Sequence, residues 1–434
     1  MKICSQKDIK VITGIMAASL LLGGCTANTK TGVRNDPKVK TEINLAKVSD
    51  TEYDKNTMDE LYRNYCFDLF SSTVNGYGSE DNVMISPASV MMALDMVAAG
   101  AKEDSLKQLT DLFAKGQGPL TQQAYAASLM DKINGAKDVD FSCANAVWSN
   151  KKILGDSVNL EYVDYIQKTF DAEYKAINFD NKTADEINKW VDNHTNHMIE
   201  KIIGGLDEMT VMVLVNAIAF EGKWLTPYED DQIADGVFRK LSGTQNVQFL
   251  HSMEDTYFET EKAKGVMKDY MGGKYAFLAI LPVDEKISAN EFAKNFTSED
   301  YGKFIASAES GCKVKTMIPE FEYDFDIVLN DTVKNLGCKD IFDPNTADLS
   351  GIAGKQGDIY VSKIIHKTHI EVDRAGTKAA AATVVSLEVG SAMPDEPQEI
   401  KIVECDRPFV YAIVDKESMA PVLCSAPALM YLSI

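Results

Sequence analysis

The sequence predicts a mixed α+β fold, and three stretches carry that prediction. Residues 183–203 repeat apolar side chains at helical spacing throughout, which is typical of an amphipathic helix. Residues 212–220 are apolar on both faces of an extended chain, as in the central strand of a sheet. From residue 377 to 389, a period of two separates an uncharged face from one that holds every charge in the run. This last stretch is a latent strand, patterned for burial on one side.

Length and charge bound the possible functions. The 434 residues are 45% hydrophobic and 25% charged, which is the composition of a packed globular protein. This length fits one large domain or two or three ordinary ones. The formal net charge is −21, so we expect neither nucleic acid nor a heparin-like polyanion as a partner.

The N-terminus predicts export and lipid attachment. Three lysines precede an apolar run, residues 11–22, which ends in Leu-Gly-Gly-Cys at residues 22–25. The run is too short to span a bilayer, and it resembles a bacterial lipoprotein signal, residues 1–24, that is cleaved before a lipid-bearing Cys25. We therefore expect an extracytoplasmic protein held at the cell membrane by lipid on Cys25. Release into the extracellular space stays an open alternative.

A polar tether and scattered cysteines follow the signal. Residues 25–50 lack apolar periodicity and are expected to form a flexible tether. The other cysteines show neither a C-x-x-C pair nor the spacing of metal ligands. Disulfides are open to an exported protein, but we expect mostly free, buried thiols because the chain is large enough to stabilise itself without them. These cysteines are Cys66, Cys143, Cys312, Cys338, Cys405 and Cys424.

The first half of the body is expected to be mainly helical. Residues 58–71 show nearly helical apolar spacing. Residues 82–94 are expected to form a short strand that enters a helix, because Pro87 suits the first turn and Ser86 and Ser89 suit the cap. The same patterns predict a helix at 104–113, a buried strand at 144–148 and an amphipathic helix at 161–170.

The second half adds strands around the latent one. A helix is expected at residues 326–336, where Gly337 would stop it. Apolar strands are expected at 277–282 and 314–321, and a strand pair at 406–414 and 421–426. Asn216 alone interrupts the apolar strand at 212–220, and a buried amide needs hydrogen-bond partners.

The latent strand has an unusual composition. Four successive alanines suit a helix or a linker, whereas the flanking threonines and valines favour a strand. No proline interrupts residues 376–393, so a full ladder of hydrogen bonds is possible. Its uncharged face consists of Thr377, Ala379, Ala381, Thr383, Val385, Leu387 and Val389. The opposite face consists of Lys378, Ala380, Ala382, Val384, Ser386 and Glu388.

Several motifs together resemble those of the serpins. They are G-T-K-A-A-A-A-T at 376–383, D-R-P-F-V-Y-A-I at 406–413, N-x-I-x-F-x-G-x-W at 216–224 and S-P-A-S at 86–89. The resemblance covers about 350 residues. It implies one domain, residues 51–434, with three β-sheets, about eight to nine helices and an exposed reactive-centre loop at about 374–404. The loop hinge would be Gly376, Thr377, Lys378, Ala379, Ala380, Ala381, Ala382 and Thr383.

The resemblance also assigns roles around the central sheet. Ser86 and Ser89 would lie beneath the sheet where it parts, and His366 would hydrogen-bond to Asn216 across the gap. Trp224 would cover the end where the loop enters. Two further residues, Arg374 and Glu320, stand where the family has a glutamate and a lysine, so we expect the same ion pair with its charges exchanged.

The function implied by the resemblance is inhibition of proteases as a suicide substrate. The cleaved loop would insert as a new strand and trap the acyl-enzyme. Family spacing places the reactive bond between Gly390 and Ser391, in a window that also includes Leu387, Glu388, Val389, Ala392 and Met393. The small residues of this window suit serine proteases of elastase-like or subtilisin-like specificity. Papain-like cysteine proteases stay an alternative target.

Two other classes of function compete with inhibition. A non-inhibitory serpin acting as a binding module more often has proline or bulky charges in its hinge, and this hinge lacks them. A lipoprotein hydrolase would need a catalytic set, and no nucleophile elbow or Ser-His-Asp order is present. His194 and His197 lie three residues apart without a third ligand, so we expect ordinary surface histidines. We predict no catalytic residues, metal or cofactor, and a monomer whose partner is its target protease.

Overall fold

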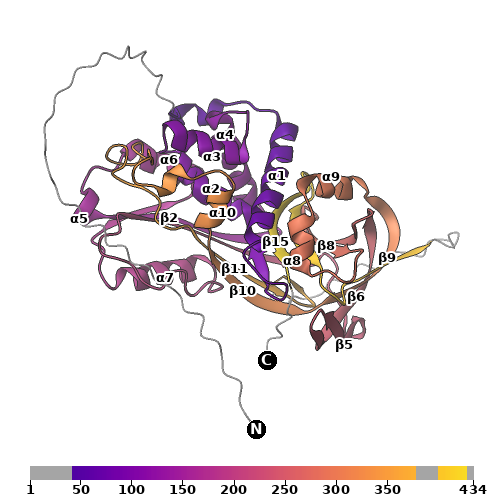
Figure 1. The fold of residues 1–434 in the computed structure, drawn as a ribbon. Coiled ribbons are helices and arrows are strands. Elements are labelled where there is room, and N and C mark those ends of the chain that lie inside the picture. Colours follow the sequence, from indigo (N-terminus) through magenta and orange to yellow (C-terminus); the bar gives the residue numbers. More distant parts are fainter. Residues whose placement is uncertain (1–41, 378–398, 428–434) are drawn as a thin grey trace, which may run out of the picture. The chain divides into compact units, whose positions relative to one another are not determined.

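The computed structural model describes residues 42–377 and 399–427 (Figure 1). Several expectations fall outside these residues: the signal at 1–24, the lipid on Cys25, the hinge beyond Thr377, and the reactive bond between Gly390 and Ser391. They stay predictions.

Helices and strands are mixed, as predicted, within the described residues. The α-helices are α1 (Lys55–Val74), α2 (Pro87–Ala98), α3 (Glu103–Phe113), α4 (Pro119–Asn134), α5 (Lys151–Leu154), α6 (Leu160–Phe170), α7 (Thr183–His194), α8 (Ala289–Asn295), α9 (Ser298–Ala306) and α10 (Asn330–Asn335). Short 3-10 helices are η1 (Leu45–Asp50), η2 (Asp230–Gln232) and η3 (Asp340–Phe342). The ten described α-helices exceed the expected eight to nine because they include single-turn segments such as the four-residue α5.

Six strands form one sheet, in the order β10-β11-β12-β4-β2-β3. Their bounds are β10 (Phe321–Val328), β11 (Ile365–Val372), β12 (Gly376–Thr377), β4 (Met212–Lys223), β2 (Val139–Asn150) and β3 (Glu173–Ile177). The strand pairs are antiparallel except β2 with β3. As predicted for a central strand, β4 is buried along most of its length and lies between two neighbours.

The other nine strands form a second hydrogen-bonded sheet. They are β1 (Val83–Ile85), β5 (Ile233–Lys240), β6 (Gly243–Glu259), β7 (Ala263–Asp269), β8 (Tyr275–Pro282), β9 (Glu309–Pro319), β13 (Ile400–Glu404), β14 (Val410–Asp415) and β15 (Ala420–Ala426). Three sheets were expected. The long strand β6 joins two of them, because it pairs with β5 and β9 along most of its length and with β7 at its C-terminal end.

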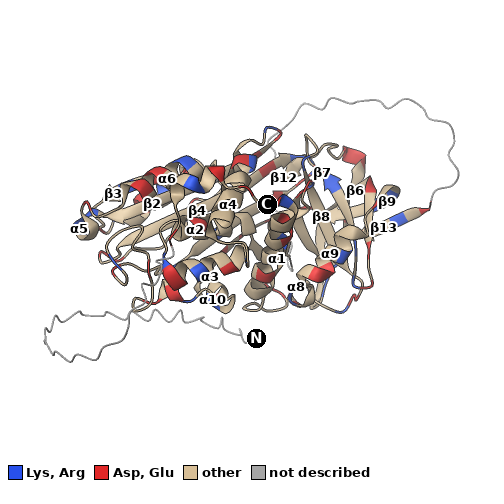
Figure 2. Ribbon diagram, turned by 90° about the horizontal axis from the view of Figure 1, so that it is seen from above, with Lys and Arg blue, Asp and Glu red and all other residues tan. Residues whose placement is uncertain are grey.

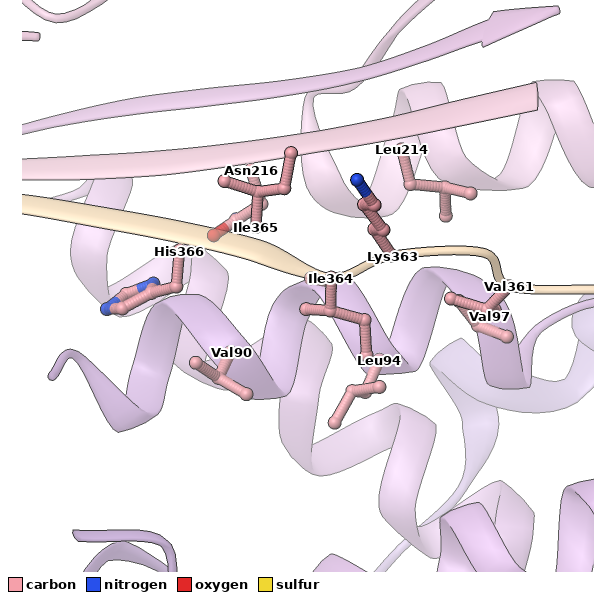
Figure 3. Close-up of a pocket in the computed structure, with 11 residues that line it drawn as sticks. Val90, Leu94, Val97, Leu214, Asn216, Val361, Lys363, Ile364, Ile365 and His366 are labelled. Atoms are coloured by element: carbon pink, nitrogen blue, oxygen red, sulfur yellow. The ribbon is translucent and has the colours of Figure 1, made fainter. Parts of the chain in front are cut away.

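Helix α2 lies against the six-stranded sheet in the region where β11 and β4 diverge (Figure 3). Its start matches the prediction, since Pro87 occupies the first turn and the side chain of Ser86 accepts a hydrogen bond from the backbone of Ser89. Nearly all of α2 is buried. Its apolar side chains belong to the main core, which also contains α1 and the central strands of the nine-stranded sheet.

Two expected helices are shorter than predicted. The helix at 183–203 ends at His194, because Asn196 and His197 adopt left-handed backbone angles, with φ of 49° and 61°. The helix at 326–336 begins only at Asn330, since the residues before it continue β10, where pairing with β11 outweighs helical spacing. Gly337 follows with φ of 105°, as expected for a glycine stop.

The folded body begins earlier than the predicted tether boundary at residue 50. Residues 45–50 form η1, and Val48 within it is buried. Glu42 forms an ion pair with Lys102, at 2.7 Å between Oε2 and Nζ. The end of the expected tether therefore packs on the domain, because Val48 adds apolar contact that its polar neighbours do not reveal in the sequence.

The free cysteines among the described residues agree with the prediction of mostly free, buried thiols. Five cysteines are free thiols, and all but Cys312 are buried. Acidic and basic residues both lie on surface helices such as α3 and α6, where Lys107 pairs with Asp111 and Lys168 pairs with Asp164 one turn away (Figure 2). None of the described helices has both the length and the apolar character to cross a membrane.

Candidate functional site at the opening of the six-stranded sheet

A tight turn after β11 feeds the predicted hinge into the sheet. The carboxylate of Asp373 accepts hydrogen bonds from the backbone N–H groups of Ala375 and Gly376, at 2.7 and 2.9 Å. The backbone N–H of Asp373 donates to the carbonyl of Gly376 at 2.9 Å. These bonds reverse the chain, so that Gly376 and Thr377 become β12 between β11 and β4.

Trp224 lies against this turn, where the resemblance placed it. Its indole N–H donates to the carbonyl of Asp373 at 2.9 Å, and its backbone N–H donates to Ala375 at the same distance. The buried ring stacks on Tyr270, with centroids 4.6 Å apart. The hydroxyls of Tyr270 and Thr377 are 2.6 Å apart, so the first hinge threonine is anchored on the core side.

Glycine is required at position 376 by the neighbouring backbone. A Cβ at Gly376 would lie 2.1 Å from the carbonyl oxygen of Gly222 and 2.8 Å from Cα of Lys223. Neither atom belongs to a flexible side chain, so a larger residue would force β12 away from β4. The close approach explains why the hinge begins with glycine.

A second group of polar side chains lies deeper, between α2 and the sheet. The backbone N–H of Ser86 donates to Nε2 of His366 at 3.0 Å, and its hydroxyl donates to the carbonyl of Val422 at 2.8 Å. The hydroxyl of Ser89 bonds to Oδ1 of Asn216. The amide of Asn216 donates to Oδ1 of Asn145 at 2.5 Å. The helix and both sheets are thus tied together by buried hydrogen bonds.

The direct bond expected between His366 and Asn216 is not formed among the described residues. Each side chain instead bonds to one of the two serines of α2's first turn. Burial lowers the pKa of His366 to about 3. Because Nε2 accepts a hydrogen bond, the proton of this neutral imidazole lies on Nδ1.

A narrow cavity lies beside this network. It encloses about 30 Å³, room for one or two waters. Figure 3 shows side chains from β4, β11 and α2 around it. The lining residues are Val90, Ala93, Leu94, Val97, Leu214, Asn216, Val361, Lys363, Ile364, Ile365 and His366. In the described part of the chain, only β12 lies between β11 and β4, and it ends at Thr377, before the level of this cavity.

Comparison with known proteins identifies the family. The model for serpins, the serine protease inhibitors, matches residues 60–426. The chain belongs to the serpin family. Human Serpin B7 is 31% identical over 370 residues, covering 80% of this serpin and 93% of that protein. An uncharacterized serpin-like protein of Methanosarcina mazei is 28% identical over 419 residues, covering 94% and 95%. The crystal structure of tengpin, a thermophilic serpin, in the native state has a TM-score of 0.78 at 32% identity, covering 88% and 96%.

One ion pair of this serpin differs from the expectation. Arg374 was expected to pair with Glu320, but its guanidinium forms an ion pair with Asp230 of η2. Glu320 still lies close, and the charge of Arg374 and its backbone N–H act to lower the pKa of that carboxyl. Burial and the nearby Asp373 outweigh them, so the pKa of Glu320 is raised. The exchanged pair is therefore corrected to an Arg374–Asp230 pair at the surface.

Sequence reasoning missed three residues that hold the serpin hinge and the turn before it. Tyr270 comes from a distant strand end, and its spacing from Thr377 carries no local signal. Asp373 could have been found, because an aspartate three residues before a glycine is typical of a turn closed by its own side chain. Asp230 was missed because its partner lies 144 residues away.

Proposed function

We propose that this serpin inhibits extracytoplasmic serine proteases of elastase-like or subtilisin-like specificity by inserting its cleaved loop between β11 and β4. The observation that carries the proposal is β12. Thr377 already pairs on both sides, with Val372 of β11 and with Gly222 of β4, and Gly376 pairs with Lys223 of β4. A strand continued from β12 would have β11 on one side and β4 on the other as pairing partners.

The register of β12 predicts where a strand continued from it would lie. In antiparallel pairing, each step along the loop is one step back along each neighbour. Six residues beyond Thr377, Thr383 would therefore stand opposite His366 on β11 and Asn216 on β4. Residues paired across strands share a face, so Thr383 would point toward α2.

The composition of the loop fits this path. Ala379 and Ala381 would point to the same face as Thr377 and Thr383. Between the two threonines, the inserted strand would therefore present only small side chains to that face. Val385 would reach the level of Leu214 and Ile364, which line the cavity. The side chain of Val385 would therefore pack against the apolar lining of the cavity, and its burial favours the inserted state.

The covalent step is ordinary acyl transfer by the protease. Its serine oxygen attacks the carbonyl carbon of Gly390, forms an ester to that residue and releases the amine of Ser391. Insertion would then pull the ester-linked protease away from its productive geometry before water attacks. We further propose that lipid on Cys25 holds a monomeric inhibitor at the cell membrane.

The test is a denaturing gel after incubation with an elastase-like protease. A boiling-resistant band at the summed mass less that of the released fragment, with that fragment beginning at Ser391, supports the proposal. Such a band with papain-like proteases alone would reassign the target class. Cleavage without any such band across a protease panel would favour a non-inhibitory serpin.

A variant tests the register itself. Thr383→Arg would place a charge against the buried His366 and Asn216, so cleavage should continue while the covalent band is lost. Lys378→Arg, also in the loop and on the opposite face, is the matched control and should keep the band. Equal trapping by both variants would contradict this register.

A further inference from the structure

Four polar side chains lie close together on the face of the sheet opposite α2, and Lys367 on the same face forms an ion pair with one of them, Asp324. Strands β10 and β11 are antiparallel, with Glu322 opposite Glu371 and Asp324 opposite His369. His366 and Val372 point to the buried face, and the alternating burial of β11 sends His369 and Glu371 to the other one. Two rigid neighbouring strands therefore hold one imidazole among three carboxylates.

The orientation of His369 is set by Asp324. Nδ1 of His369 lies 2.8 Å from Oδ1 of Asp324. An ionised carboxylate only accepts hydrogen bonds, so Nδ1 carries the proton and a neutral imidazole has its lone pair on Nε2. Nε2 lies 4.0 Å from Oε1 of Glu322. One ligand atom each from Glu322, His369 and Glu371 lies within 4.8 Å of the others.

We propose that Glu322, His369 and Glu371 bind a divalent transition-metal ion of the zinc class, with Asp324 as the positioning residue behind His369. One imidazole nitrogen with two carboxylates is a donor set used by zinc, whereas calcium and magnesium prefer oxygen alone. A carboxylate behind the ligand histidine is the usual second partner of such a site. A fourth position remains for water or an external ligand.

The geometry requires only side-chain movement. With metal–ligand bonds of about 2.0–2.1 Å, tetrahedral ligand atoms lie about 3.4 Å apart. The side chains of Glu322 and Glu371 are partly exposed, and His369 is held by Asp324. The ion would link β10 to β11 on the outer face, away from the side chains that meet α2. Binding should therefore stabilise the pair of strands without entering the path of the loop.

The experiment is calorimetric titration of the purified full chain with zinc chloride after treatment with a chelator. We expect one strong equivalent and a higher thermal midpoint. His369→Gln and Glu371→Gln should each weaken zinc binding at least tenfold, and Asp324→Asn about 10- to 100-fold. Cobalt(II) should show the visible absorption of a four-coordinate ion, and His369→Gln should abolish it.

His197→Gln is the matched control, because His197 is also paired with an aspartate, Asp192, but lies outside the cluster. Zinc binding should survive that change. Absence of a strong equivalent in the unaltered chain would overturn the proposal. So would unchanged affinity in His369→Gln, or loss of binding in His197→Gln. Thermal midpoints measured in chelator verify that each variant is folded.

Discussion

The buried imidazole of His366 makes the stability of this serpin depend on pH in a calculable way. Burial lowers its pKa to about 3, from an ordinary value near 6.5. Between these values the unfolded chain binds a proton that the folded chain does not. Stability is therefore present above about pH 6.5 and is lost as the pH falls toward 3. From pH 7 to pH 5 this single group should remove about 2 kcal/mol from the free energy of unfolding.

Urea denaturation of the unaltered chain and of His366→Gln at pH 7 and pH 5 measures this loss. Carboxylates titrate in both proteins, so the difference between their pH dependences isolates His366. We expect the variant to be less stable at pH 7, because the Ser86 N–H loses its acceptor or keeps a poorer one. Its further loss on acidification should be smaller by about 2 kcal/mol. His197→Gln, at an exposed histidine, is the control and should keep the full loss. Equal pH dependence in His366→Gln would refute the reasoning.

Three further predictions concern the buried acid, the surface pair and the hinge. Asp95→Asn should raise the free energy of unfolding at pH 7 by about 1–3 kcal/mol, and by less at pH 4. Burial raises the pKa of Asp95, and its second oxygen lacks a partner among the described residues. Urea midpoints at both pH values test this prediction. Arg374→Glu should lower the thermal midpoint slightly and adding Asp230→Arg should restore it, since the pair is exposed; a double variant no better than the single contradicts the pairing. Gly376→Ala should lose the covalent protease band while the loop is still cut, because its Cβ would collide with β4; undiminished trapping would contradict that close approach.

The sequence predicted the features that local chemistry determines. The cap at Ser86 follows from a serine before Pro87, and the central strand β4 follows from a run too apolar for a surface. The helix expected from residue 326 was wrong at its start, because pairing of Asp326 with Lys367 in β10 and β11 depends on a distant segment. The spacing of apolar residues within one segment does not show that the segment pairs with a strand about forty residues ahead.

The hydrogen-bond partners of the site were less predictable than its positions. Asn216 was expected to need partners, and it has two, but neither is the expected histidine. A buried amide has several donors and acceptors to satisfy, and which neighbour reaches each depends on side-chain angles rather than on sequence spacing. The resemblance therefore located the residues, while the structure was needed to pair Asn216 with Ser89 and Asn145.

If the loop inserts as proposed, the contacts at the turn before β12 and the buried contacts at α2 should respond differently to mutation. Trp224 and Asp373 hold the turn above β12, and a strand growing downward from Thr377 leaves those contacts in place. They set the register of insertion. The bonds of His366 and Asn216 run to the first turn of α2, on the face toward which Thr383 would point, so its arrival would disturb them. Weakening the upper contacts should therefore misplace the strand, whereas weakening the deeper ones should lower the barrier to its entry.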